Sequence, residues 1–235
     1  MKVNKLITFS ANNKGFSIIE AKLLRANFLR LIKNDVADKI GTYASSETEI
    51  AKQILENFEI FKAKENRMFS KKSAGLAIGM LKEDPNFNLR ETDFITDEEN
   101  LGYSNLYWRC VRANASGDVG SIHADKWFWD LGHGSIPKGY TRVKTWIPLL
   151  QEPGVCGLQI LPRSHLENFD YDYKIGNDGK KRPQLINEAG IKHRMQSAGV
   201  DVGSAIIFND RLLHGGISTG SLRISIEWTT CLKTS

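Results

Sequence analysis

One short segment, GSIHADKWFWD at residues 120–130, places a histidine and a carboxylate two positions apart. His123 offers an imidazole nitrogen and Asp125 offers carboxylate oxygens, and both groups are ligands for divalent metals. Side chains at positions i and i+2 of a β-strand point to the same face. We therefore expect the pair to chelate one metal ion from a single extended segment.

The pair by itself is a weak signal. The chain has 27 acidic residues and five histidines among 235 residues, so such a pair arises by chance about half the time. A second pair, His165 and Glu167, does occur, but it follows LPRS at the end of a predicted strand, where nothing holds both side chains on one face. We predict that this second pair binds no metal.

A third ligand must come from the remaining histidines. His214 is the best candidate, because it follows the apolar segment SAIIF and leads directly into Gly215 and Gly216, whose bare backbone allows close approach of another group. His133 and His193 have no such context and are expected to be loop or surface residues. Two histidines and one carboxylate on one side of an ion, with open positions opposite, are typical of non-haem Fe(II) oxygenases.

An arginine follows the third ligand at a position that suggests a binding role. Arg223 opens the segment RISIEW, in which alternation places Arg223 and Ser225 on one face and the apolar residues on the other. If the apolar face packs against helices, Arg223 points into the interior and requires an anionic partner there. A 2-oxoglutarate molecule that chelates the metal provides one, because a guanidinium binds a carboxylate in a bidentate manner.

The elements that must position these residues fall into two regions. Residues 1–104 are predicted to be mostly helical. The first helix follows a capping box at residues 17–20, the second follows a similar signal at residues 46–49 and extends to Phe61, and the third covers residues 73–82.

From about residue 105 to residue 232 the pattern changes to short strands separated by turn residues, which indicates an all-β region. Seven strands are predicted, at residues 106–113, 120–124, 141–150, 157–161, 193–199, 204–208 and 222–231. Residues 163–192 form a long connection, which we expect to be either a lid over the site or a solvated surface loop.

Composition narrows the class of protein. No apolar run approaches the roughly 20 residues that span a bilayer, and residues 1–10 lack the apolar core of a secretory signal, so we expect a cytoplasmic protein without a membrane partner. The three cysteines are widely separated and are expected to be free thiols. The net charge is +5, but basic residues are scattered among acidic ones, so we expect no nucleic-acid partner and a mild preference for small anions.

The ordered motifs of the second region resemble those of the Fe(II)/2-oxoglutarate oxygenases, and within them the phytanoyl-CoA dioxygenase-like family. The matching pieces are HAD at 123–125, WIPL at 146–149, GLQILPRSH at 157–165, IF at 207–208 leading to HGG at 214–216, and RIS at 223–225. The resemblance covers about residues 106–228, and the N-terminal region matches only in being helical. It implies a single oxygenase domain over 1–235, mainly β with flanking helices, whose core is a double-stranded β-helix (jelly-roll, cupin-like).

The same resemblance implies roles for individual residues. His123, Asp125 and His214 would bind Fe(II), and Arg223, helped by Ser225, would bind the distal carboxylate of 2-oxoglutarate. Trp146 matches a position that lines the cosubstrate pocket, although a core tryptophan is an equal interpretation. Some relatives also hold 2-oxoglutarate with a hydroxyl two residues after the distal histidine, where this chain has Gly216.

The implied reaction is hydroxylation of a small molecule at a C–H bond, with dioxygen consumed and succinate and CO₂ released. Halogenating relatives lack the carboxylate ligand, so Asp125 favours hydroxylation. Four cationic residues on or beside predicted strands would favour an anionic substrate if they face inward: Arg109, Arg112, Arg142 and Lys144. Trp127 and Trp129 are expected to be packing residues, and Glu227 has no assigned partner.

Two other functions compete with this one. The first is a cupin-like metalloenzyme that does not use 2-oxoglutarate, against which Arg223 argues. The second is a catalytically silent ligand-binding relative, against which the complete set of metal ligands argues. The oligomeric state and the identity of the substrate are not predicted.

Overall fold

The computed structural model describes residues 13–176 and 178–234. Within these ranges, no helix has the length and apolar character needed to cross a bilayer. The expectation about a secretory signal concerns residues 1–10, which lie outside the described residues.

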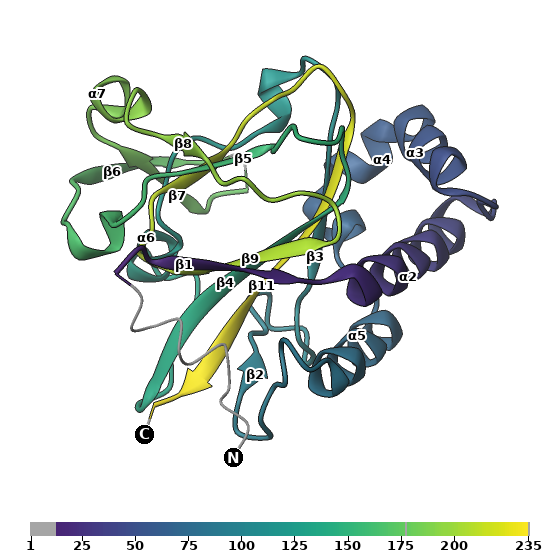
Figure 1. Ribbon diagram of the computed structural model, residues 1–235, viewed down its shortest axis with the longest axis horizontal. Coiled ribbons are helices and arrows are strands. Elements are labelled where there is room, and N and C mark those ends of the chain that lie inside the picture. Colours follow the sequence, from purple (N-terminus) through teal and green to yellow (C-terminus); the bar gives the residue numbers. More distant parts are fainter. Residues whose placement is uncertain (1–12, 177, 235) are drawn as a thin grey trace.

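A six-stranded antiparallel sheet forms the centre of the molecule (Figure 1). Five strands follow one another in the order β1 (Phe16–Glu20), β9 (Ser204–Asn209), β4 (Tyr140–Leu150), β11 (Arg223–Lys233) and β2 (Phe94–Ile95). The sixth, β3 (Tyr107–Val111), pairs with the first half of β11, next to the region where β2 pairs. The long strands β4 and β11 are thus paired with neighbours on both sides.

A smaller antiparallel sheet contains β10 (His214–Gly216), β5 (Leu158–Ile160) and β8 (Gln196–Ser197). An isolated bridge pairs His123 with His214, so the segment around His123 continues this sheet beyond β10. Antiparallel sheets with helices outside them agree with the predicted mainly β class.

The N-terminal helices lie together beside the large sheet, on the right in Figure 1. They are α2 (Lys22–Ile40), α3 (Glu47–Glu56), α4 (Phe58–Lys62), η2 (Lys64–Arg67) and α5 (Lys71–Glu83). The sequence predicted helices in this region, but it missed β1 and β2, which join the large sheet. Residues 1–104 are therefore not purely a helical addition to the core.

The predicted capping box at residues 17–20 is wrong. Ser17 lies in the middle of β1 and pairs with Ile207 of β9, and the helix begins at Lys22 with no side-chain cap at Ala21. Local sequence favours a helix start here, but β9 offers a full ladder of backbone hydrogen bonds, and that tertiary pairing prevails.

The second capping signal is confirmed. The hydroxyl of Ser46 accepts a hydrogen bond from the backbone N–H of Glu49 and starts α3. The predicted helix to Phe61 is, however, two helices, because Asn57 leaves the helical conformation between α3 and α4. The third helix is confirmed as α5.

Two predicted strands and the long loop need correction. Residues 120–124 form no strand beyond the His123 bridge, and most of residues 193–199 are irregular except β8. The connection at residues 163–192 is largely ordered into four elements: η4 (Ser164–Leu166), β6 (Tyr171–Ile175), β7 (Lys181–Leu185) and α7 (Glu188–Lys192). The strands β6 and β7 form a hairpin whose register pairs Tyr171 with Leu185.

Strand β11 separates two environments, as its alternating pattern predicts. Ile224, Ile226 and Trp228 are buried against the helices, and the Trp228 ring lies 5.8 Å from the Phe28 ring of α2 and 5.9 Å from that of Phe87. Arg223, Ser225 and Glu227 alternate with them and therefore face the interior between the sheets.

Trp228 is 1% exposed and packs against two aromatic rings, that of Phe28 in α2 and that of Phe87 after α5. We expect Trp228→Ala to lower the free energy of unfolding by about 3–5 kcal/mol, through lost burial and the cavity left behind. Urea denaturation measures this change. Leu23→Ala on the exposed side of α2 is the control, expected to change stability by less than about 0.5 kcal/mol. Equal losses in both variants would contradict the prediction.

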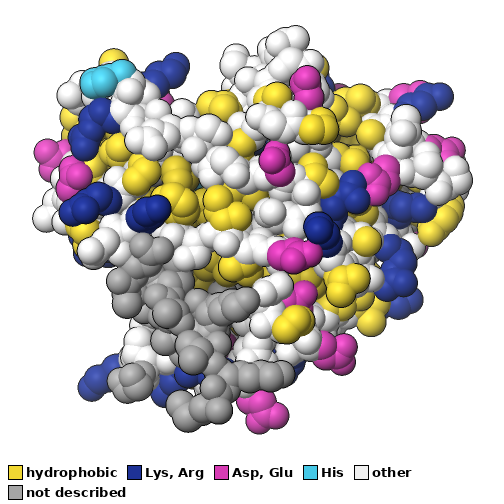
Figure 2. Space-filling view, in the orientation of Figure 1, with side chains coloured by type: hydrophobic (Ala, Val, Ile, Leu, Met, Phe, Trp, Pro, Cys, Tyr) yellow, Lys and Arg dark blue, Asp and Glu magenta, His cyan; other side chains and the backbone are white. Residues whose placement is uncertain are grey.

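Side chains of both charges are interspersed on the face shown in Figure 2, with apolar side chains between them. The three cysteines are buried and unpaired, as predicted.

Candidate metal centre

Three side chains from two distant segments meet between the sheets. The ligand atoms of His123, Asp125 and His214 all lie within 4.8 Å of one another. The Nε2 atom of His123 is 3.7 Å from Oδ1 of Asp125, and that of His214 is 3.8 Å from Oδ2. The sequence-based prediction that these three residues come together therefore agrees with the geometry.

Backbone pairing holds the two histidines beside each other. The N–H of each donates to the carbonyl of the other at 2.9 Å, and the two imidazole rings are 4.4 Å apart. Asp125 reaches the site in a different way from the one we predicted. It is the first residue of α6 (Asp125–Asp130), so the pair does not share one face of a strand. The turn into this helix brings the carboxylate to both imidazoles.

Each imidazole has one nitrogen engaged by the backbone. Nδ1 of His123 lies 2.8 Å from the carbonyl of Ser121, and Nδ1 of His214 lies 3.0 Å from that of Leu212. Because a carbonyl only accepts hydrogen bonds, Nδ1 carries the proton and Nε2 keeps its lone pair. Both lone pairs are therefore available at the side where Asp125 lies, which is the tautomer that metal ligation requires.

The electrostatics of the group fit a bound cation. Burial by itself would raise the pKa of Asp125, but the Lys144 ammonium and the neighbouring histidines hold it below its usual range. Burial lowers the pKa of His214 to about 4, so this imidazole is neutral at pH 7. Oδ2 of Asp125 is buried without a hydrogen-bond partner among the described residues. An ionised carboxylate with an unpaired buried oxygen, facing the Nε2 atoms of two imidazoles, matches the N₂O donor set of an Fe(II) site.

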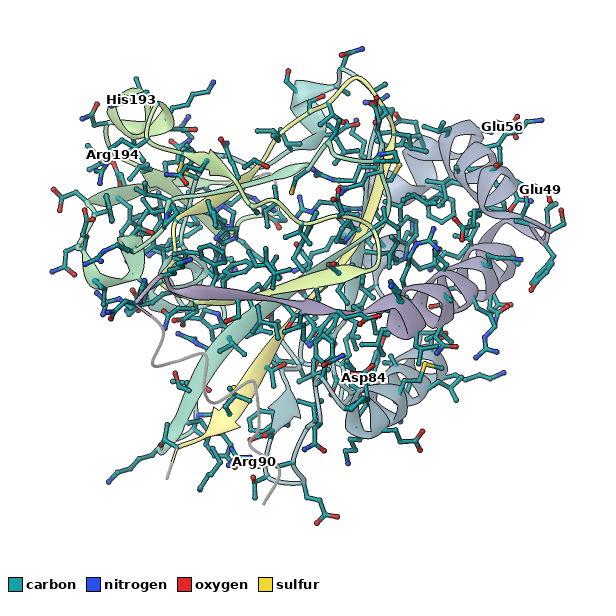
Figure 3. The ribbon with its side chains drawn as sticks, viewed as in Figure 1. Glu49, Glu56, Asp84, Arg90, His193 and Arg194 are labelled. Carbon is teal, nitrogen blue, oxygen red and sulfur yellow. The ribbon has the colours of Figure 1, made fainter. Side chains whose placement is uncertain are left out.

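The other histidines lie outside this group. Nε2 of His133 is 2.5 Å from the carbonyl of Lys181 in the β6–β7 hairpin, and His193 is exposed beside α7 (Figure 3). His165 lies in η4, away from the group, and burial lowers its pKa. Of the described residues, only His123, Asp125 and His214 form a cluster able to hold a metal.

Arg223 lies at the start of β11, is 3% exposed and lines the same cavity as the metal cluster. Its Nη1 donates to the carbonyls of Gly157 and Ile217. Gly157 makes this position possible, because a Cβ there would lie 1.7 Å from Nη1. Trp146 of β4 also lines the cavity, with its ring 5.8 Å from the guanidinium carbon.

The charge of Arg223 has no carboxylate partner among the residues that the structure describes. Burial, and then the nearby Arg109, lower its pKa to about 10, so it stays charged at neutral pH. Its Nε and the Ser225 hydroxyl are both buried without hydrogen bonds. A buried cation with unsatisfied neighbours is costly unless an anion binds to it. This observation supports the predicted role of Arg223 and leaves Ser225 available as a helper.

A cavity of about 1520 Å³ is lined by the cluster, by Arg223 and by the β6–β7 hairpin. The hairpin contributes Lys181, Arg182 and Gln184 to the lining. It is attached to α6 by stacking of Tyr171 on Trp127, with ring centroids 4.7 Å apart. Trp127 is thus a packing residue, as expected. The long connection covers one side of the cavity as an ordered structure.

Of the four cationic residues on the predicted strands, two line the cavity and two do not. Arg142 pairs with Asp210 at 2.7 Å, and Arg112 pairs with Asp118 at 2.9 Å, and neither lines the cavity. Arg109 and Lys144 do line it. Glu227, for which the sequence suggested no partner, lies 3.3 Å from Arg109.

The role of Gly157 was missed at the sequence level. Gly157 comes directly before β5, the strand that pairs with β10, and its contact with Arg223 forms only when the chain folds.

Comparison with known proteins agrees with this site. The family model described as "Phytanoyl-CoA dioxygenase (PhyH)" matches residues 13–224. A search of curated proteins found no match. Among solved structures, EctD from S. alaskensis with 2-oxoglutarate and 5-hydroxyectoine has a TM-score of 0.58 at 14% identity, covering 100% of this chain and 76% of EctD. EvdO2 from Micromonospora carbonacea var. aurantiaca complexed with 2-oxoglutarate has a TM-score of 0.54 at 14% identity, covering 100% and 94%.

The fold and the site define a mainly β protein with a jelly-roll core of the double-stranded β-helix type, as predicted. The chain belongs to the phytanoyl-CoA dioxygenase family, whose members are Fe(II)/2-oxoglutarate-dependent dioxygenases.

Proposed function

We propose that this protein hydroxylates a small-molecule substrate at a C–H bond, with Fe(II) held by His123, Asp125 and His214 and with 2-oxoglutarate held by Arg223. One observation carries the proposal. The two Nε2 atoms and the unpaired Oδ2 of Asp125 converge in the same cavity as a buried arginine that has no anionic partner among the described residues.

Fe(II), 2-oxoglutarate and dioxygen together supply an oxidant for an unactivated C–H bond and release succinate and CO₂. The protein supplies orientation. The Ser121 and Leu212 carbonyls fix the two imidazole rings, and Arg223 fixes the distal carboxylate of 2-oxoglutarate, with Ser225 and Trp146 beside it. The carboxylate ligand Asp125 occupies a position that a halide would need, which favours hydroxylation.

The solved relatives support this assignment by what they bind. EctD was crystallised with 2-oxoglutarate and 5-hydroxyectoine, and EvdO2 with 2-oxoglutarate. The jelly roll places Arg223 on the central strand β11, from which its side chain enters the shared cavity. A cupin-like metalloenzyme without 2-oxoglutarate would leave this buried charge without a partner.

The decisive experiment is anaerobic addition of Fe(II) and 2-oxoglutarate. We expect the weak visible charge-transfer band of the chelate in the wild-type protein and its loss in His123→Ala. A band of unchanged intensity in His123→Ala would remove His123 from the site. Metal binding in the wild type without any band, and without succinate after oxygen is admitted, would instead support the silent ligand-binding alternative.

A further inference from the structure

Lys144 is the buried cation of the cavity that has no direct partner. It lies on β4, is 8% exposed and lines the cavity. Its ammonium makes no hydrogen bond or salt bridge to any residue in the described parts of the chain. Burial disfavours its charge, but Asp125 and Glu227 raise its pKa, so it remains an ammonium. This ammonium lines the cavity without a direct protein partner among the described residues, so it is available to bind an anion.

A second cation faces the same space. Arg109 of β3 is on the interior face, opposite Ser225 of β11, and its guanidinium contacts Glu227 through one nitrogen at 3.3 Å. Burial would raise the pKa of Glu227, but Lys144 and Arg109 lower it to about 2. With Asp125 assigned to the metal, this inner group has the two positive charges of Lys144 and Arg109 against the single negative charge of Glu227.

Three other cations of the cavity lining already have carboxylate partners. Lys64 and Lys180 both bind Glu99, at 2.5 and 3.1 Å, and Arg182 binds Asp178 at 2.8 Å. Lys144 of β4 and Arg109 of β3 flank β11 from opposite sides, so an anion between them would lie over the interior face of this strand.

This position is distinct from that of Arg223. Lys144 is paired with Thr229 on β11, six residues beyond Arg223, and at about 3.3 Å per residue this corresponds to roughly 20 Å along the strand. Arg109 is paired with Ser225, nearer to Arg223, but its guanidinium reaches Glu227. An anion bound between Arg109 and Lys144 is therefore a different group from the carboxylate assigned to Arg223.

We propose that Lys144 and Arg109 bind an oxyanion of the substrate, a carboxylate or a phosphate, with Glu227 holding the two cations in place. This inference rests on the proposed function, because its ligand is the molecule to be oxidised. It narrows the substrate class to organic anions that carry their charge at the end opposite the 2-oxoglutarate carboxylate.

An anion of minimal size tests the site without knowledge of the substrate. Crystals grown with Zn(II) and 2-oxoglutarate would be soaked in sodium iodide, and the anomalous map would locate the iodide ions. We expect a peak between Lys144 Nζ and the Arg109 guanidinium in the wild type, its loss in Lys144→Met, and its retention in Lys144→Arg. The surface variant Arg112→Gln, with a comparable loss of charge, is expected to keep the peak.

Several outcomes would overturn the proposal. The proposal fails if iodide binds at other cations but not at Lys144, or if the peak persists in Lys144→Met. It also fails if the 2-oxoglutarate carboxylate itself lies at Lys144. If iodide binds at Lys144 but no 2-oxoglutarate is bound at Arg223, the anion site is supported and the proposed use of 2-oxoglutarate is not.

A solution assay tests the same inference on turnover. Pools of organic carboxylates and phosphates, and matched pools of their neutral amides and alcohols, would be screened for stimulation of succinate formation. We expect stimulation by anions, and for the active compound a loss in kcat/KM of about 30-fold or more in Lys144→Met, mainly through KM, with partial recovery in Lys144→Arg. Stimulation by neutral compounds alone, or an unchanged KM in Lys144→Met, would contradict the inference.

Discussion

Replacing His214 by alanine is expected to lower the affinity for a divalent metal by more than about 100-fold. Mutating a residue that only hydrogen-bonds a metal ligand already lowers metal affinity by up to about 100-fold, and His214 is a ligand itself. His214 supplies one of the two imidazole nitrogens, and its backbone also positions His123 through two hydrogen bonds of 2.9 Å. Because alanine preserves that backbone pairing, the loss reports the missing nitrogen. Competition between the protein and a chromophoric chelator for Co(II) or Zn(II) measures the affinity directly.

The exposed His193, which points away from the body of the molecule in Figure 3, provides the matched control. His193→Ala removes the same side chain and should bind metal as the wild type does. A His165→Ala variant tests the other histidine–carboxylate pair, which the structure leaves outside the cluster. Metal affinity that survives in His214→Ala, or that falls equally in His193→Ala, would refute the assigned site.

Adding one methyl group at Gly157 is expected to weaken 2-oxoglutarate binding by at least about 30-fold. The new Cβ would lie 1.7 Å from Nη1 of Arg223 and 2.6 Å from its Cδ and Cζ, so the guanidinium must leave its position. Removing one partner of a buried charge pair costs about 2–5 kcal/mol, which sets this minimum. Titration of the metal-loaded protein with 2-oxoglutarate, followed by calorimetry, measures the change.

Gly117→Ala is the control for this substitution, since a Cβ at residue 117 meets no atom within 4 Å. Arg223→Gln should reproduce the loss seen in Gly157→Ala, and the double variant should add little, because both changes remove the same contact. Wild-type affinity in Gly157→Ala would show that Arg223 does not hold the cosubstrate from its observed position.

The sequence alone identified the residues that meet at the site. Metal ligation requires particular side-chain types, so five histidines left few candidates, and the pattern of β11 fixed Arg223 on the interior face because successive side chains of a strand alternate. The strands β3, β4, β9 and β11 were predictable for the same reason, since a sheet with one face on the core requires that periodicity.

The tertiary structure decided which partners each segment meets. Ser17 lies in a strand because β9 was available to pair with it, and Asp125 reaches the histidines from a helix start that the extended-strand argument did not foresee. Arg142 and Lys144 share a strand face, yet Asp210 neutralises the first, and no residue in the described parts of the chain pairs directly with the second. Local sequence encodes which way a side chain points along its own strand. What meets that side chain depends on segments far away in the chain, and only packing brings those segments together.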